Sequence, residues 1–520
     1  MSRIVFESER PVAQVNPGRA DIACFAGLVR CIQGATLPAA VLDWLAAQGW
    51  VDGPYARPLS PIADIPVPIE NYAAFTALFD GGGSEASFGT DYVAATVRTF
   101  FAQGGKRCYV VRMDDPVTPT DDVAAKQAKL QKLLPGGTYS LDDQRGWHGA
   151  GHLAGLPEVS FLVMPDLPAL CASAPEGAKG QTPATPSGPE QFVECSNAEV
   201  AAEPTLTYGA SGPRLTDKDY GNWAQAVQTV LQYLSSSLRE MQLVAAFPLP
   251  QDTSIAATAE NPADSLTQDI HDVIFAQMKE TPGLNGSISS AFLQLSYPWL
   301  RTSGSWVLLE GLEPPDGALA GILARNALTR GTFQNATKII PAEVFDLSPI
   351  LPGQETRVSA TPLSWGDNSL KPLIERLSLF GFTPSGIALL SDVTAYPGES
   401  YRPGRIHRLV SVILRAARNF GDHIVFQTNG PALWARVQRF LLNLMTQLWQ
   451  LNALDGATIQ DAFSVRCDRS TMTQNDLDNG RLVAIVSFNA ASTIELIRVT
   501  LALEASGTSA QTIAVLAEAS

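Results

Sequence analysis

The chain has 520 residues, of which 45% are hydrophobic and 17% are charged, and its formal net charge is −15. The length suggests roughly three domains at about 100–200 residues each. The composition excludes a wholly disordered chain, a collagen and a coiled-coil rod. The acidic total argues against nucleic acid as a partner, because phosphate binding needs a basic surface.

Neither a disulfide scaffold nor a membrane span is expected. The six cysteines are sparse and form no CxxC pair, which favours reduced thiols packed as small apolar groups. The first ten residues lack the apolar core of a signal peptide, and no stretch reaches 18 uncharged apolar residues. The cysteines are Cys24, Cys31, Cys108, Cys171, Cys195 and Cys467.

Short strands and helices alternate in the first part of the chain. Ile62–Ile69 is rich in proline and extended. The apolar periodicity of Asp91–Phe101 predicts a helix, which Gly104-Gly105 stops. Continuous apolar runs predict buried strands at Cys108–Met113 and Val159–Met164, whereas residues 114–146 are polar and variable.

The composition changes sharply at residues 171–218, where Pro, Gly, Ala, Ser, Thr and Glu dominate. Such a stretch buries too little apolar area to offset its ordering entropy, so we interpret it as an exposed insertion. Beyond it we expect a helix at Asn222–Met241, a strand at Leu243–Phe247 and a helix around Ser265–Met278. Further α/β alternation continues to about Pro397.

The last 120 residues give the clearest pattern. An amphipathic helix is expected at Arg405–Asn419, followed by a strand at Asp422–Gln427. A second helix should begin at Asn429-Gly430-Pro431 and end at Gly456. Three strands complete the pattern, at Ala462–Cys467, Leu482–Phe488 and Ile494–Leu503.

No catalytic, cofactor or metal set emerges from the motifs. Gly104-Gly105-Lys106-Arg107 lacks the first Gly and the Ser/Thr of a phosphate-binding loop. Gly149–Ala154 fits G-x-G-x-x-A, but a polar segment precedes it in place of the strand that a dinucleotide site needs. His148 and His152 are four residues apart, yet no Cys or carboxylate completes a metal-binding set nearby, so a surface loop leading into a short helix is the preferred interpretation.

Charge is unevenly distributed along the chain. Residues 401–450 hold seven arginines and one aspartate, a net of +6, which leaves −21 on the other 470 residues. Arginines on the outer face of an amphipathic helix are usually only solvated, but this asymmetry indicates a negatively charged partner. The arginines are Arg402, Arg405, Arg408, Arg415, Arg418, Arg436 and Arg439.

Both termini carry candidate free strands. Arg3–Phe6 precedes a connector at Pro11–Pro17, and a hinge at Ala505–Gln511 precedes an apolar tail at Thr512–Leu516. Free strands of this kind can add to the sheet edge of another subunit. Frayed ends, or strands that pair within their own subunit, remain the alternative.

Several segments in a fixed order carry a family resemblance. The chain resembles contractile tail sheath proteins, the family shared by contractile phage tails and phage-tail-like contractile injection systems. One departure is Asn335-Ala336-Thr337, where the family has a Pro-Ala-Asn step. The segments are Asn71–Arg112, Leu156–Asp166, Tyr297–Leu300, Pro314–Gly331, Arg405–Leu409, Phe440–Leu442, Ala453–Gly456 and Phe463–Gly480.

The resemblance implies a multi-domain α/β architecture. An N-terminal arm would span residues 1–20 and a C-terminal hinge and arm residues 505–520. Between them, residues 21–397 would form outer and middle α/β domains with insertions near 114–146 and 171–218. Residues 398–504 would form an inner two-layer α/β domain with a mixed sheet.

The resemblance also implies a structural function without a cofactor. Subunits would stack as six-fold discs around an inner tube. They would assemble in the cytoplasm, with a baseplate at one end of the sheath and a terminator or cap protein at the other. The sheath would then contract from a metastable extended state and drive the tube through an envelope. The finished particle would be virion-like or extracellular. The arms would add strands to neighbouring subunits through Arg3, Ile4, Val5, Phe6, Thr512, Ile513, Ala514, Val515 and Leu516.

From the charge asymmetry we add a hypothesis of our own, an inner-tube contact made by Arg405, Arg408, Arg415, Arg418, Arg436 and Arg439. Charge reversal at Arg408 and Arg415 should then leave the fold intact and impair assembly on the tube. Two other classes stay open, a non-contractile tube or capsid-like structural protein and an α/β enzyme of unknown reaction.

Overall fold

The computed structural model describes residues 19–51, 56–57, 59, 61–79, 89–118, 120–136, 143–173, 212–250, 288–349, 373–424, 427–490 and 496–503. The expected arms, Arg3–Phe6 and Thr512–Leu516, lie outside the described residues. So do the expected helix at Ser265–Met278, the Ala505–Gln511 hinge and most of the 171–218 insertion.

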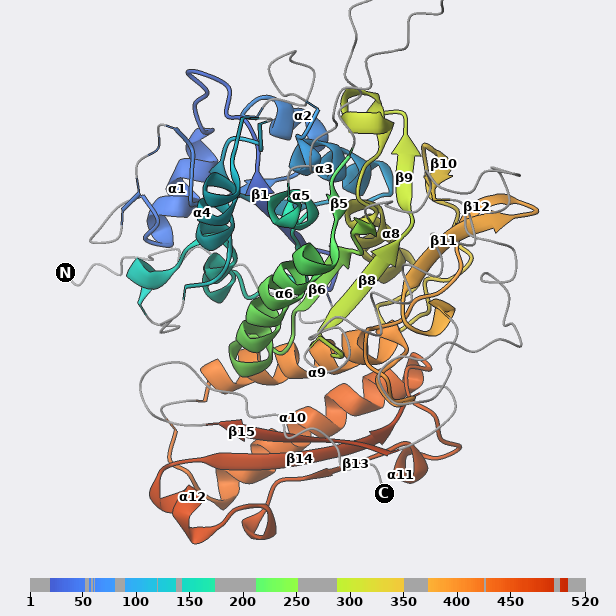
Figure 1. The fold of residues 1–520 in the computed structure, drawn as a ribbon. Coiled ribbons are helices and arrows are strands. Elements are labelled where there is room, and N and C mark those ends of the chain that lie inside the picture. Colours follow the sequence, from blue (N-terminus) through green and yellow to red (C-terminus); the bar gives the residue numbers. More distant parts are fainter. Residues whose placement is uncertain are drawn as a thin grey trace, which may run out of the picture.

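An eight-stranded mixed sheet organises residues 19–395, which we call the sheet body (Figure 1). Its strand order is β12-β11-β8-β6-β4-β1-β3-β2, with parallel pairing from β3 to β11 and an antiparallel strand at each edge. The strands are β1 (Ala23–Leu28), β2 (Pro66–Ile69), β3 (Cys108–Asp114), β4 (Phe161–Val163), β6 (Gln242–Ala246), β8 (Leu293–Tyr297), β11 (Ser378–Thr383) and β12 (Gly386–Leu389).

Two short ribbons accompany this sheet. They pair β5 (Arg214–Leu215) with β7 (Leu249–Pro250), and β9 (Trp299–Thr302) with β10 (Val344–Ser348). The 3-10 turns of the sheet body are η2 (Gln144–Gly146), η3 (Gly149–Gly155), η4 (Ser305–Val307), η5 (Leu309–Gly311) and η6 (Leu373–Glu375).

Helices cover the large sheet, which is why its central strands are mostly apolar and buried. Two of them, α3 and α8, pack against each other and over β1, β4, β6 and β8. The helices of the sheet body are α1 (Ala39–Ala47), α2 (Tyr72–Thr76), α3 (Tyr92–Ala102), α4 (Val123–Leu133), α5 (Leu167–Cys171), α6 (Asp217–Ser237) and α8 (Asp316–Thr329).

The C-terminal body, residues 401–503, is a smaller two-layer unit. Its antiparallel sheet has the order β13-β14-β15 and consists of β13 (Phe463–Arg466), β14 (Leu482–Asn489) and β15 (Leu496–Leu503). Its helices are α9 (Gly404–Asp422), α10 (Pro431–Gln450), α11 (Ile459–Ala462) and α12 (Gln474–Asp478), and η7 (Arg469–Thr471) is a 3-10 turn.

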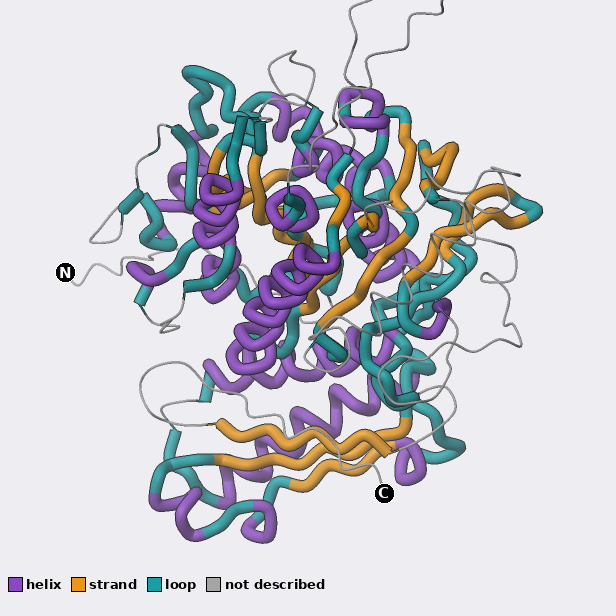
Figure 2. Tube along the Cα trace, in the orientation of Figure 1, coloured by secondary structure: helices purple, strands orange, loops and turns teal. Residues whose placement is uncertain are grey.

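The two bodies have separate hydrophobic cores that meet at α9. The larger core runs from Ile22 to Ala395, and the smaller one joins α9, α10, β13 and β14. Figure 1 shows α9 lying across the boundary, beneath α6 and β8 of the sheet body. Figure 2 shows the three strands crossing α10 in the lower part of the view, and β15 also contacts α9.

The structure confirms most of the expected elements and corrects three of them. The strand expected at Asp422–Gln427 is wrong, because α9 continues to Asp422 and a turn follows it. The polar segment 114–146 contains a helix, α4. The side chain of Asp122 caps its N-terminus by accepting a hydrogen bond from the backbone N–H of Ala125. The mixed α/β class agrees with the expectation, but the small sheet, expected to be mixed, is antiparallel in its described strands.

Helix α10 ends earlier than Gly456, the residue expected to stop it. Asn452 adopts a left-handed conformation with φ of 57°. The backbone N–H of Ala453 donates to the carbonyl of Leu448, and that of Asn452 donates to Trp449. Asparagine tolerates the left-handed position nearly as well as glycine, so this C-terminal capping motif forms without a glycine.

No helix among the described residues is long and apolar enough to cross a membrane.

A buried carboxyl group in the sheet body makes its stability depend on pH. The side chain of Glu313 is fully buried and accepts hydrogen bonds from the hydroxyls of Thr99 (2.6 Å) and Thr302 (3.1 Å). Burial raises the pKa of Glu313 to about 8, although both hydrogen bonds lower it. The folded protein therefore holds a proton here that the unfolded chain has lost at neutral pH.

Because the pKa of Glu313 is raised on folding, stability should fall as pH rises from the ordinary glutamate value toward 8. Glu313→Gln should therefore show a smaller decrease in Tm between pH 5 and pH 9 than the parent protein, as measured by calorimetry. The exposed Glu399→Gln variant is the control and should keep the parental slope. An unchanged slope in Glu313→Gln would contradict the assignment.

Candidate functional site

Helix α9 is buried on two sides, and this decides where its arginines lie. Its apolar side, which includes Ile406, Leu409 and Ile413, belongs to the smaller core as the sequence pattern predicts. Its polar side does not face solvent, because Arg408 and Arg415 are 3% and 1% exposed. These two side chains project into the sheet body and bind its polar groups.

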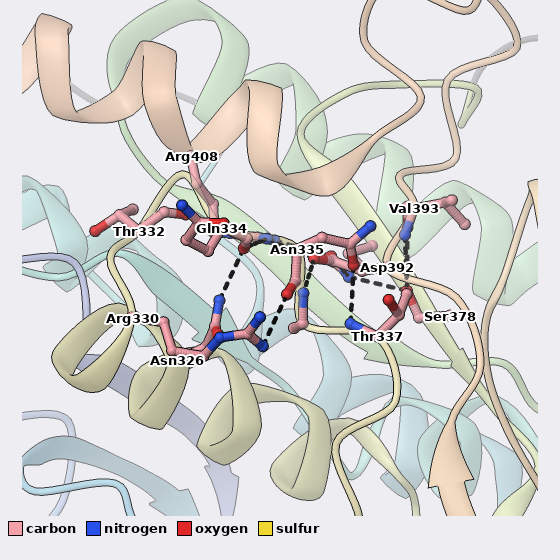
Figure 3. Close-up of polar contacts among 12 residues, drawn as sticks. Asn326, Arg330, Thr332, Gln334, Asn335, Thr337, Ser378, Asp392, Val393 and Arg408 are labelled. Atoms are coloured by element: carbon pink, nitrogen blue, oxygen red, sulfur yellow. Dashed lines mark hydrogen bonds and ion pairs between the residues drawn. The ribbon is translucent and has the colours of Figure 1, made fainter. Parts of the chain in front are cut away.

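Arg408 forms a buried ion pair with Asp392 (Figure 3). Its two terminal nitrogens donate to the two carboxylate oxygens at 2.9 Å and 2.6 Å, a bidentate arrangement. Its Nε donates to the carbonyl of Thr332 at 3.2 Å, and Nη2 also reaches the carbonyl of Gln334 at 3.4 Å. The guanidinium therefore ties α9 to two segments of the sheet body.

Asp392 is in turn fixed by the sheet body. Its carboxylate accepts hydrogen bonds from Nε2 of Gln294 in β8 at 3.0 Å and from the backbone N–H of Ala336 at 2.9 Å. Burial raises the pKa of this carboxyl, but the charge and hydrogen bonds of Arg408, with those of Ala336 and Gln294, hold it below its ordinary value. Asp392 is therefore held as an anion by α9 and the sheet body together.

The Asn335-Ala336-Thr337 step, which departs from the family pattern, lies inside this network (Figure 3). Ala336 supplies a hydrogen bond to Asp392, and the Asn335 side chain accepts one from the backbone N–H of Thr337 at 2.8 Å. The local sequence thus retains a loop that presents its backbone to the carboxylate.

Two more arginines continue the docking side of α9. Arg415 donates to the carbonyls of Arg19 (2.5 Å) and Val159 (2.9 Å) and to the hydroxyl of Ser160 (3.0 Å). Arg418 pairs with Glu240, which follows α6 and is 2% exposed. Three arginines on one helix side therefore bind three separate parts of the sheet body.

This arrangement corrects the exposed basic face expected from the sequence. Arg408 and Arg415 are buried, Arg418 is mostly covered and Arg405 is half-buried, so α9 does not present them as a solvated row. Periodicity correctly placed them opposite the apolar side. It could not reveal that residues far away in sequence cover that side.

Arg436 and Arg439 are exposed on α10, as expected. Arg436 donates to Oε1 of Gln427 at 3.1 Å and lies over the ring of Phe420, 5.9 Å from its centre. Helix α10 contains no Asp or Glu. Its exposed side is therefore basic and amide-rich, with Leu442 partly exposed.

The small sheet offers an open edge within the described residues. Strand β13 pairs only with β14, and β14 pairs with β15 on its other side. Along β13 the side chains alternate, with Phe463 and Val465 buried and Ser464 and Arg466 exposed. An unpaired edge of this kind is a template for another strand.

The two histidines singled out by their spacing bind the same carboxylate. Asp64 lies 3.1 Å from Nδ1 of His148 and 2.9 Å from Nε2 of His152. Trp50 Nε1 donates to Nδ1 of His152 at 3.1 Å, so the neutral ring carries its hydrogen on Nε2 and donates it to Asp64. Within the described ranges, no group of three His, Cys, Asp or Glu residues is placed to hold a metal ion.

Sequence reasoning missed the acceptors of the docking interface, Asp392, Glu240 and the carbonyl groups. One signal was available, since Gln294 interrupts the apolar strand Leu293–Tyr297 and is fully buried. A polar residue in a buried strand needs a partner, and here that partner is Asp392. The backbone carbonyls that accept from Arg408 and Arg415 could not be predicted from the pattern of side chains.

Removing the Arg408 guanidinium should destabilise the protein strongly. Arg408→Met leaves Asp392 as a buried charge without its counter-ion, a loss of about 3–5 kcal/mol in the free energy of unfolding. The matched control is Arg436→Met, which removes an exposed arginine and should change that free energy by less than about 0.5 kcal/mol. Urea unfolding of both variants tests this, and equal stabilities would contradict the buried pair.

No protein-family model matches the sequence, and no curated protein matches it. Solved structures do match. A chain in the cryo-EM structure of the anti-feeding prophage (AFP) baseplate in contracted state aligns over 95% of both chains, with a TM-score of 0.54 and 16% identity. A chain in the six-fold symmetrised AFP baseplate aligns over 95% of this chain and 96% of its own, with a TM-score of 0.52 and 15% identity.

A third match comes from the AFP helical sheath in contracted state. It covers 95% of this chain and 96% of that chain, with a TM-score of 0.51 and 16% identity. Similarity at this level of identity establishes the fold. The chain therefore shares, over nearly its whole length, the fold of a protein in a contractile sheath.

Proposed function

We propose that this protein is the structural subunit of a contractile sheath, which polymerises around an inner tube and contracts to drive that tube through a target envelope. The observation that carries the proposal is the fold shared with the AFP helical sheath over 95% of this chain and 96% of the other. A match over both bodies is more specific than one shared α/β domain would be.

In the proposed assembly, subunits form six-fold discs that stack on a baseplate and end at a terminator or cap protein. Residues 398–504 face the tube, residues 21–397 form the outer wall, and residues 1–20 and 505–520 are the arms. The particle is a virion-like or extracellular one that assembles in the cytoplasm. Its energy is stored as the difference between two packings of one subunit, so no cofactor is required.

Strand exchange between subunits is supported by the open edge of β13. The arms, Arg3–Phe6 and Thr512–Leu516, add to the small sheets of neighbouring subunits in this proposal. Main-chain hydrogen bonds would then link subunits in a way that tolerates sliding and rotation elsewhere.

The contact with an acidic inner tube is proposed for Arg436 and Arg439, which are exposed, with Arg405 at the margin. Arg408, Arg415 and Arg418 are withdrawn from it because they bind the sheet body. Contacts between exposed charges are weak and sensitive to salt, which suits a surface that must release the tube.

Two other classes are distinguishable by one experiment. Negative-stain microscopy of purified particles would show both long narrow and short wide tubes for a contractile sheath. A non-contractile tube or capsid-like protein would show a single diameter, and an α/β enzyme would form no tube.

Deleting the C-terminal arm should separate folding from assembly. A chain truncated after Ser506 keeps β13, β14 and β15, so it should remain soluble with the parental Tm. It should form no long sheaths, because neighbours would lack the added strand. Electron microscopy measures sheath length, and tubes of normal length from the truncated chain would refute the arm's role.

Charge reversal on α10 should impair assembly on the tube without loss of fold. Arg436→Glu with Arg439→Glu should keep the parental Tm, because both side chains are exposed. The yield of sheathed tubes should fall, and most steeply at low salt. Lys106→Glu with Lys218→Glu, which reverses two exposed positive charges of the sheet body, is the matched control. Equal yields from the two double variants would rule out a specific contact at α10.

A further inference from the structure

A buried histidine lies at the boundary between the two bodies. His407 precedes Arg408 on α9 and is 4% exposed. Its ring packs edge-on against Phe292, just before β8 of the sheet body, with 5.1 Å between ring centres. Nδ1 lies 3.4 Å from the hydroxyl of Ser411, and Nε2 has no hydrogen-bond partner.

The surroundings of His407 offer no anion for a protonated ring. Phe292 is apolar, Ser411 is neutral, and the charged group that acts on the ring is the guanidinium of Arg408. The carboxylate of that network, Asp392, already accepts two hydrogen bonds from Arg408, one from Gln294 and one from Ala336. A second positive charge would therefore be buried beside the first without compensation.

We propose that α9 is an acid-sensitive joint, in which protonation of His407 favours release of the C-terminal body from the sheet body. Separation of α9 from Phe292 exposes the ring to water, where the imidazolium is solvated. The same movement breaks the Arg408–Asp392 pair, so the joint opens as a unit and not by gradual loosening.

The pH range follows from the difference between the pKa of the His407 ring when it is buried and its pKa when it is exposed. Burial, with a smaller contribution from Arg408, lowers the pKa of His407 to about 3 from the ordinary value of 6.5. A group whose pKa is lowered on folding stabilises the closed joint fully above pH 6.5, and this stabilisation is lost as pH falls below it. Between pH 7.5 and pH 5.0 the equilibrium constant for opening should rise about 30-fold.

This joint is a property of the single chain and does not depend on the proposed function. In a sheath it would make acid weaken the link between the tube-facing and outer parts of each subunit. The joint proposal is tested on unassembled subunits. A negative result there would not contradict the sheath proposal, and a failure of the chain to assemble into sheaths would not contradict the joint proposal.

The test is hydrogen exchange of the full-length subunit at pH 7.5 and pH 5.0, corrected for the intrinsic effect of pH on exchange. Peptides from α9 report opening of the joint, and peptides from β1 and β3 report the sheet body. We expect α9 protection to fall about 30-fold at pH 5.0 while β1 and β3 change less. In His407→Gln, which cannot be protonated, the fall in α9 should disappear.

His423→Gln is the matched control, since His423 caps the same helix but is exposed, and it should behave as the parent. His407→Leu serves as a second neutral variant if the glutamine packs poorly. The proposal is overturned if α9 protection does not change with pH, or if it falls equally in the parent and the neutral variants. Equal loss in β1, β3 and α9 would show unfolding of the whole chain and would also overturn it.

Discussion

The buried guanidinium of Arg408 is the constraint on which the arrangement of the two bodies depends. A charge at that depth is tolerated only with a counter-ion and hydrogen bonds in good geometry. Asp392, Gln294 and Ala336 form such a site on the sheet body, so α9 has one position in which Arg408 is satisfied. Arg415 and Arg418 then find their acceptors along the same helix side. These polar contacts therefore fix the position of α9 on the sheet body, which apolar packing alone would not do.

The same constraint divides the C-terminal body into surfaces with different roles. The side of α9 that carries Arg408 is used inside the subunit, so within residues 401–450 the exposed arginines, Arg436 and Arg439, lie on α10. The small sheet keeps the open edge of β13, while the large sheet is covered by helices and ends in antiparallel strands. Within the described residues, the unpaired edge of β13 is one place where another strand can add.

The difference between expected and observed arginine positions has a clear physical origin. Amphipathic periodicity identifies the apolar side of a helix, and it did so for Ile406, Leu409 and Ile413. It says nothing of what covers the opposite side. The acceptors for Arg415 include the backbone carbonyls of Arg19 and Val159. Every residue has a backbone carbonyl, so the side-chain pattern does not indicate which ones will accept these bonds. The bonds of Arg415 join residues 255 to 396 positions apart, whereas Arg408 and Asp392 are 16 positions apart.

Local periodicity and the order of motifs were enough to predict the α/β class, the apolar strands β3, β4 and β6, the amphipathic helices α9 and α10 and the family resemblance. Only the tertiary structure decided that Arg408 and Arg415 are internal, that Asp392 receives α9 and that His407 is buried without an anion. Burial is a property of surfaces brought together by the fold, and charge alone does not reveal which surfaces meet.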